Sequence, residues 1–104
     1  MKDIEKIEIK IYNMKNRMEL YIVPSTLKVY KKDEEKDISL EQIEKLLSII
    51  CTWEHEYEDR TIVDGGGYQV LITTSTGVDE YTGVGAYPTS FRQFQDIVGD
   101  IYDR

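Results

Sequence analysis

The strongest constraint on the fold is a period-two alternation of apolar and polar side chains through residues 7–30. Alternation of this kind indicates half-buried β-strands, because successive side chains of a strand point to opposite faces of the sheet. Pro24 ends the second segment, since proline cannot donate a hydrogen bond to a neighbouring strand. We therefore predict strands over 7–12, 18–23 and 27–30. Their inward-facing residues are Ile7, Ile9, Ile11, Met18, Leu20, Ile22, Leu27 and Val29.

After residue 38 the spacing of apolar residues changes to steps of three and four. Ser39 and Gln42 have the spacing of a capping box, in which each side chain bonds a free backbone N–H at the start of a helix. The apolar stripe that follows predicts a helix from Ser39 to about Trp53. Its members are Leu40, Ile43, Leu46, Leu47, Ile50 and Trp53.

The second half of the chain repeats the order of strands followed by a helix. Alternation predicts strands over 68–74 and 78–84, joined by a three-residue hairpin loop in which Gly77 takes a left-handed conformation. Ser90 and Gln93 have the spacing of a second capping box. The last helix has an apolar stripe made of Phe91, Phe94, Ile97, Val98 and Ile101.

These patterns predict one α+β domain over residues 1–104, with an antiparallel sheet of about five strands in the order βββα-ββα and two amphipathic helices packed on it. The mixed-charge run 31–37 is interpreted as a solvated loop, and the patterns do not decide between one sheet and two. Cys51 is the only cysteine, which excludes an intrachain disulfide and fits a reducing compartment. With no apolar run long enough to span a bilayer and no signal-peptide pattern, we expect a cytoplasmic protein.

Charge is distributed unevenly along the chain, whose net charge is −7. Residues 1–52 contain ten Lys/Arg and ten Asp/Glu, whereas residues 53–104 contain three Lys/Arg and ten Asp/Glu. An acidic surface repels nucleic acids and membranes and attracts basic proteins. We therefore expect a basic protein partner and no direct binding to nucleic acid or membrane. The alternative is that the acidic charge only keeps the protein soluble.

The stretch DEYTGVGAYPTSFRQF at 79–94 carries two glycines into the start of the last helix. Helix N-termini attract anions, so the stretch is a candidate phosphate site. It matches neither the P-loop nor the dinucleotide-binding pattern, and only Arg92 is basic. Gly83 and Gly85 suit a strand that leaves the sheet, and Pro88 suits the approach to a helix. We interpret the stretch as a strand-to-helix connection.

The same region carries the one family resemblance in the chain. DGGGYQVLI, a short turn, EYTGVGAYPTSF and an amphipathic helix span residues 64–102. They resemble small bacterial and phage domains of unknown function that have a D-G-x-x-[YW] strand and a G-x-x-x-[YF]-P-x-[SN]-[FW] connection. The resemblance implies a fold for this part of the chain, and it implies no activity or site residue.

Cys51 and His55 are the main candidates for chemistry, because a spacing of four places them on one face of a helix that extends so far. A thiolate is disfavoured near a helix C-terminus, and a free cysteine commonly packs as a small buried apolar residue. A zinc site at Cys51 and His55 lacks two further cysteine or histidine ligands, for which acidic neighbours would have to substitute, and no calcium-loop pattern is present. We therefore expect no enzyme activity, metal or cofactor, with a Cys/His-dependent enzyme as the alternative.

The leading hypothesis is a small acidic inhibitor that blocks a basic nucleic-acid-binding surface of a partner protein. In character, though in no motif, the chain resembles anti-CRISPR proteins and other anti-defence inhibitors of phages and mobile elements. An immunity protein that neutralises a toxin nuclease is the close alternative, and a structural domain is another. The acids expected to replace nucleic-acid phosphates are Glu54, Glu56, Glu58, Asp59, Asp96, Asp100 and Asp103.

Tyrosines suggest a second interface. The chain has eight tyrosines and two phenylalanines, and tyrosine is enriched at protein interfaces. Tyr12, Tyr21 and Tyr30 occupy the polar positions of the first three strands, so we expect them to share an exposed sheet face with Lys10 and Lys28. Exposed aromatic residues also stack on nucleic-acid bases, but the net charge argues against that use.

Overall fold

The computed structural model of the chain describes residues 4–12, 17–32, 34–58 and 66–103. Within these ranges it has two helices and seven strands, with a short 3-10 helix at Pro24–Thr26. The strands are β1 (Ile4–Tyr12), β2 (Arg17–Val23), β3 (Lys28–Lys31), β4 (Glu34–Asp37), β5 (Glu56–Glu58), β6 (Gly67–Thr74) and β7 (Gly77–Val84). The helices are α1 (Leu40–Ile50) and α2 (Phe91–Asp103).

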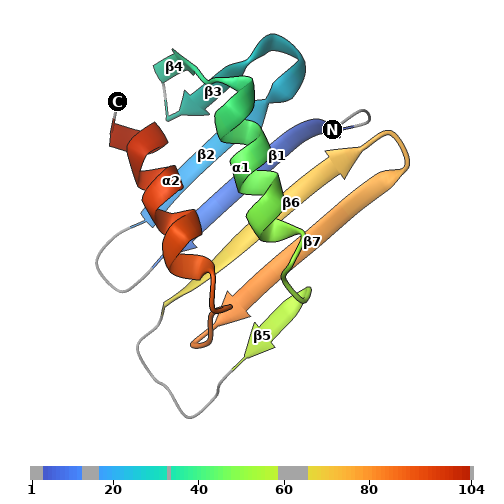
Figure 1. Cartoon of the computed structure of the whole chain (residues 1–104), viewed down its shortest axis with the longest axis vertical. Helices are drawn as coiled ribbons and strands as arrows, with labels where there is room; N and C mark the ends of the chain where they lie inside the picture. The colour runs from blue at the N-terminus through green and yellow to red at the C-terminus, as the bar shows by residue number, and fades with distance from the viewer. Residues whose placement is uncertain (1–3, 13–16, 33, 59–65, 104) are drawn as a thin grey trace.

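All seven strands form a single sheet in the order β4-β3-β2-β1-β6-β7-β5 (Figure 1). The pairing is antiparallel except between β5 and β7, which run parallel. β1 joins the two halves of the sheet, because it pairs with β2 on one side and with β6 on the other. The question that the sequence left open is therefore answered by one continuous sheet.

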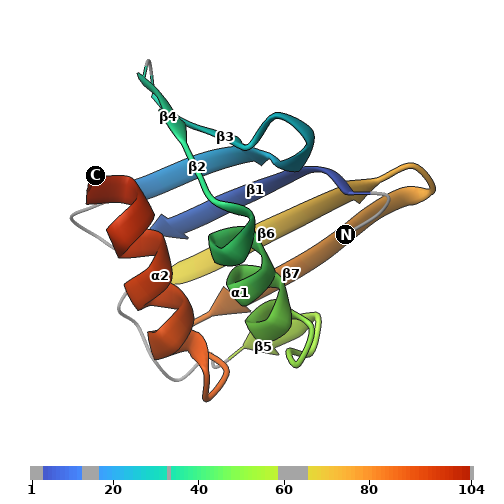
Figure 2. The same cartoon turned by 45° about the horizontal axis from the view of Figure 1, so that its top comes forward.

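Both helices lie on the same face of this sheet (Figures 1 and 2). The core between the layers takes Ile9 and Val70 from the central strands, Leu46 from α1, and Phe94 and Val98 from α2, all of them fully buried. The apolar residues of the strands and those of the helices thus pack together in one core. Among the described residues, no helix covers the other face of the sheet.

The expectation of about five strands was wrong, because two short edge strands have no apolar alternation. β4 lies in the run that was interpreted as a solvated loop, and all four of its residues are charged. It is held by backbone pairing with β3 and by the ion pair between Lys28 and Asp37. β5 has three residues, of which only Tyr57 is partly buried. Charged, short strands are typical of sheet edges, where they discourage pairing with other chains.

Three local expectations also need correction. Leu27 does not open a strand: it has a left-handed backbone after the 3-10 helix, and 40% of its surface is exposed. α1 ends at Ile50 rather than near Trp53, although Trp53 is still buried in the core. The β6–β7 hairpin pairs Thr74 with Gly77, so its loop has two residues rather than three.

The start of α1 is as predicted, and so are the roles of the two glycines before α2. Ser39 and Gln42 form the capping box, with both reciprocal bonds present. The Ser90 hydroxyl, predicted to form a second capping box with Gln93, accepts a hydrogen bond of 2.8 Å from Nε1 of Trp53. Gly83 lies against the Tyr68 ring, and a Cβ at this glycine would lie 2.6 Å from the Ala86 carbonyl oxygen. Gly85 has a φ of 69°, a left-handed conformation that favours glycine. Both glycines are therefore required by the bend that takes the chain from β7 toward α2.

Candidate functional site

The sheet face without helices is the candidate site, and strand register defines its residues. Positions next to the buried Ile9 and Val70 point away from the helices, because side chains alternate along a strand. One cross-strand row on this open face runs through four paired positions of β4, β3, β2 and β1. In order it contains Glu35, Tyr30, Tyr21 and Glu8, and it continues through Leu71 of β6 to Glu80 of β7.

Charge divides the sheet into two unlike halves. β1 to β4 carry equal numbers of basic and acidic residues: Lys6, Lys10, Arg17, Lys28, Lys31 and Lys36 against Glu5, Glu8, Glu19, Glu34, Glu35 and Asp37. Ion pairs connect many of them, including Lys6 with Glu8 at 3.3 Å and Arg17 with Glu19 at 3.7 Å. β5, β6 and β7 carry no lysine or arginine, and their four acids are Glu56, Glu58, Asp79 and Glu80. We call β5–β7 the acidic half of the sheet.

Three acids of this half lie on the open face. Glu56 and Glu58 are exposed and stand opposite Thr82 and Val84 of β7. Glu80 is exposed, and its Oε2 accepts a hydrogen bond of 2.7 Å from Nε2 of Gln69. Glu54, just before β5, is also exposed, and its backbone N–H donates to the Tyr57 hydroxyl at 3.2 Å. A depression of about 430 Å³ separates Glu56 and Glu58 from Tyr12 of β1, which is on the same face.

The tyrosines predicted as a second interface do lie on the open face, in two places. Tyr21 and Tyr30 are neighbours, with ring centroids 6.0 Å apart at 71°, and they expose 39% and 36% of their surface. A hydrogen bond to Glu35 raises the pKa of the Tyr30 phenol, and burial adds to the effect. Tyr12 lies away from this pair, above Gly67, where a Cβ would come within 2.8 Å of its hydroxyl.

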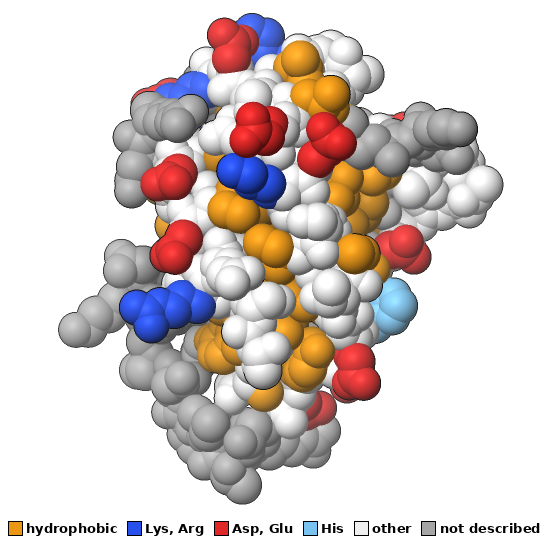
Figure 3. Space-filling model, in the orientation of Figure 1, with side chains coloured by type: hydrophobic (Ala, Val, Ile, Leu, Met, Phe, Trp, Pro, Cys, Tyr) orange, Lys and Arg blue, Asp and Glu red, His pale blue; other side chains and the backbone are white. Residues whose placement is uncertain are grey.

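The acidic stripe predicted on the last helix lies on the other side of the molecule. Asp96 and Asp100 are exposed on α2, facing away from the sheet. Arg92 is four residues before Asp96 on the same helix face, and Lys45 of α1 shares a groove of about 280 Å³ with Asp100. Figure 3, seen from the helix side, shows acidic and basic side chains interspersed. The structure therefore separates this stripe from Glu56 and Glu58.

Two of the predicted acids cannot be placed. Asp59 lies outside the described residues. Asp103 ends α2, and its side chain lies outside the part of the chain that the structure describes. The predicted partner surface therefore reduces to Glu54, Glu56 and Glu58 beside the sheet and Asp96 and Asp100 on α2.

Cys51 and His55 do not share a helix face, because α1 ends before them. Cys51 is exposed rather than buried, and its Sγ donates to the Ser48 carbonyl at 3.2 Å. The His55 ring stacks on Tyr81, with centroids 4.7 Å apart at 14°. Within the described ranges, no three His, Cys, Asp or Glu side chains gather where they could hold a metal ion.

Sequence reasoning missed Glu80, Glu8 and Glu35 as members of the face. The alternation of the first strand is enough to place Glu8 on the same sheet face as Tyr21 and Tyr30. Glu35 required the strand β4, whose sequence has no apolar signal. Glu80 required the register between β6 and β7, which places it opposite Leu71.

No protein-family model matches the chain, and the comparison with curated proteins gives no match. None of the helices in the described ranges is long and apolar enough to cross a membrane. The similarity of residues 64–102 to small bacterial and phage domains stays a prediction.

Proposed function

We propose that the chain is a small protein-binding module that docks the open face of its sheet, through the acidic half, onto a basic surface of a partner protein. The partner is a protein that handles nucleic acid, and the chain inhibits it by covering the surface that the nucleic acid would occupy. The observation that supports this proposal is the division of charge across the sheet, with four acids and no lysine or arginine on β5, β6 and β7.

The electrostatics of the acidic half suit this role. Glu56, Glu58 and Glu80 project from a paired sheet, so little backbone freedom is lost when they are held against a partner. β5, β6 and β7 contain four acids and no lysine or arginine, and such an excess of carboxylates attracts a basic surface and raises the association rate. A surface that binds phosphates is basic, so the same carboxylates take the place of phosphates.

The acidic half of the sheet fits the role better than the α2 stripe. Arg92 lies four residues before Asp96 on the same helix face, so the negative potential over α2 is partly cancelled there. Lys45 borders the groove at Asp100, but it is ion-paired with Glu41 at 3.3 Å. One flat partner surface cannot contact both the open face and the outer side of α2. We therefore assign docking to Glu56, Glu58 and Glu80, and not to Asp96 and Asp100.

The biological setting follows from the identity of the partner. A partner from a defence system, such as a CRISPR effector, makes the chain an anti-defence inhibitor. A partner that is a toxin nuclease makes it an immunity protein. Both roles use the same surface and the same physical interaction.

The test is capture of a partner from a lysate of the host organism at low salt, with three forms of the protein. The first is the wild type, and the second replaces Glu56, Glu58 and Glu80 by glutamine. The third is a control that removes three charges from the helix side, through Asp96→Asn, Asp100→Asn and Glu44→Gln. Recovered proteins are identified by mass, and each is tested for nucleic-acid binding in the presence of the chain.

The expected result is a basic nucleic-acid-binding protein recovered by the wild type and by the helix-side control and lost with the sheet variant. Adding the wild-type chain should release nucleic acid from this partner. Loss with the helix-side control alone would transfer docking to α2. A partner that binds the chain and its nucleic acid at the same time would refute inhibition by surface blocking.

A further inference from the structure

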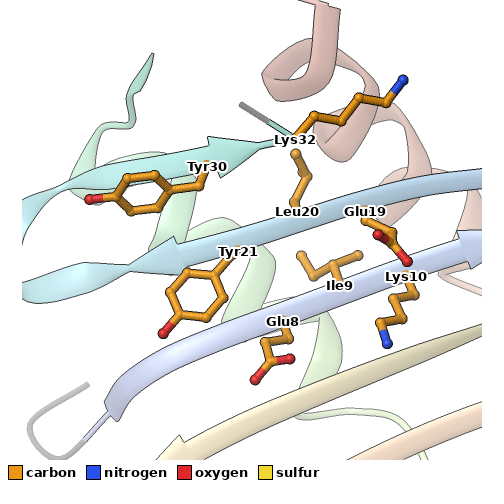
Figure 4. Close-up of a pocket in the computed structure, with 8 residues that line it drawn as sticks. All are labelled: Glu8, Ile9, Lys10, Glu19, Leu20, Tyr21, Tyr30 and Lys32. Carbon is orange, nitrogen blue, oxygen red and sulfur yellow. The ribbon is translucent and has the colours of Figure 1, made fainter. Parts of the chain in front are cut away.

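A cavity of about 520 Å³ opens on the charge-balanced half of the open face, beside Tyr21 and Tyr30. It lies over β1, β2 and β3, and its other lining residues are Glu8, Ile9, Lys10, Glu19, Leu20 and Lys32. Figure 4 shows the two tyrosine rings side by side with both hydroxyls pointing the same way, and Glu8 next to Tyr21. The cavity therefore has an aromatic wall with a carboxylate at its side.

One end of the cavity lies beside the two tyrosine rings, in the cross-strand row defined above. In that row a carboxylate stands on either side of the tyrosine pair. Glu8 is paired with Tyr21, Tyr21 with Tyr30, and Tyr30 with Glu35. This part of the row contains no cation. The face of an aromatic ring attracts a cation, and an adjacent carboxylate strengthens that attraction.

A cation of the protein itself already uses this arrangement. Nζ of Lys6 lies 5.5 Å from the centre of the Tyr21 ring and 3.3 Å from a carboxylate oxygen of Glu8. The lysines of the cavity lie elsewhere. Lys10 stands opposite Glu19 in the register of β1 and β2, and Figure 4 shows Lys32 extending away from the rings. The end of the cavity beside the rings thus favours positive charge. Lys6 approaches Tyr21 there, and Lys28, which is ion-paired with Asp37, lies close enough to Tyr30 to oppose the rise in the pKa of its phenol.

We infer that the cavity beside Tyr21 and Tyr30 receives an arginine side chain of the protein partner, with the guanidinium against the rings and hydrogen-bonded to Glu8. Arginine fits better than lysine, because its planar guanidinium stacks on aromatic rings and donates two parallel hydrogen bonds to a carboxylate. This arginine of the partner would anchor the interface described under the proposed function, so the assignment rests on that function.

The position of the cavity agrees with a single partner surface. Tyr21 on β2 and Glu80 on β7 are three strands apart, which is about 14 Å at the usual spacing of strands. An interface of ordinary size covers about 800 Å² on each partner, so it reaches both places. The acidic half then attracts the partner at long range, and the tyrosine cavity fixes its position.

The inference can be tested without the partner. N-acetyl-arginine amide is titrated into the isotope-labelled protein, and NMR shifts of the Tyr21, Tyr30 and Glu8 signals are followed. N-acetyl-citrulline amide, which has the same shape without the charge, is the matched control ligand. We expect saturable shifts at these three residues with a dissociation constant in the millimolar range for arginine, and none with citrulline.

Variants sharpen the test in both directions. Glu8→Gln keeps the size of the side chain and should weaken arginine binding about two- to five-fold, and Tyr21→Leu should do the same. Lys6→Gln removes the competing internal cation and should tighten binding by a similar factor. Unchanged spectra of α1 and α2, which lie on the other face of the sheet, would show that each variant is folded.

Equal shifts with citrulline, shifts confined to β5–β7, or no gain in affinity with Lys6→Gln would each overturn the arginine cavity. Such a failure is distinct from failure of the proposed function. If the partner is captured through Glu56, Glu58 and Glu80 while arginine does not bind, the docking surface stands and only this anchor is wrong. If arginine binds but no partner depends on the acidic half, the proposed function fails instead.

Discussion

Tyr68 offers a substitution that should stabilise the protein by removing an atom from its core. Its side chain is 1% exposed and is surrounded by aromatic rings, with centroids 5.3 Å away for Trp53 and 4.9 Å away for Phe91. The hydroxyl is buried and has no hydrogen-bond partner among the described residues. Tyr68→Phe keeps the ring and removes that hydroxyl.

The size of the effect follows from desolvation. Burying a hydroxyl without a hydrogen bond costs about 1–3 kcal/mol, because the group loses its bonds to water. The variant should therefore raise the free energy of unfolding by about 1–2 kcal/mol. For a domain of this size, 1 kcal/mol corresponds to about 4–8 °C in Tm.

The pH dependence has a defined sign. Burial raises the pKa of the Tyr68 phenol well above its ordinary value of 10.0. Above pH 10 the unfolded chain loses this proton while the folded protein keeps it, so the stability of the wild type falls as the pH rises. Tyr68→Phe lacks the group, and its advantage over the wild type should widen above pH 10.

Urea unfolding at pH 7 and at alkaline pH measures both effects. Tyr57→Phe is the matched control, because the Tyr57 hydroxyl accepts a hydrogen bond from the Glu54 N–H and its removal should destabilise by about 0.5–1 kcal/mol. The reasoning is refuted if Tyr68→Phe is destabilised as much as Tyr57→Phe, since that would mean that the Tyr68 hydroxyl has a partner.

Four further predictions concern single residues. Gly83→Ala should destabilise by about 1–3 kcal/mol in urea, because its Cβ would overlap the Tyr68 ring; Gly99→Ala, which has no atom within 4 Å of the added Cβ, should instead stabilise α2 by up to about 1 kcal/mol. Ser39→Ala should lower the free energy of unfolding by about 1 kcal/mol through loss of the capping box, and no change would show that the box is not formed. Cys51→Ala should leave partner capture unchanged, since the thiol donates to the Ser48 carbonyl of α1 and lies away from the assigned docking residues; loss of capture by a folded variant would reopen the Cys/His hypothesis.

The sequence predicted the elements whose side chains carry a period. β1, β2, β6 and both helices have apolar residues on one face, and most of these residues form the core. Leu40 is an exception, since 45% of its surface is exposed at the start of α1. β4 and β5 could not be found this way, because their pairing comes from backbone hydrogen bonds at the sheet edges. At Leu27 the alternation predicted a strand residue where the structure has none, because the 3-10 turn that begins at Pro24 places Leu27 in a left-handed conformation.

The sequence predicted which kinds of residue form the site better than it predicted where they lie in the fold. The excess of acids after residue 53 was visible, as was the parity that exposes Tyr21 and Tyr30. The acidic segment before β6 and the acidic stripe of α2 could form one surface only if they lay on the same side of the sheet. The fold instead puts Glu56 and Glu58 on the open sheet face and Asp96 on the helix side. Long-range register supplies that information, and no local pattern contains it.

The docking claim is tested most directly by the footprint of the captured partner on the open face. Methyl NMR of the chain, alone and in the complex, would follow Leu71, Val78 and Val84 through their relaxation by a soluble paramagnetic agent. We predict that all three methyl groups become protected, while Ile97 on α2 keeps its exposure. Protection of Ile97, with the three open-face methyl groups unchanged, would contradict docking through the sheet.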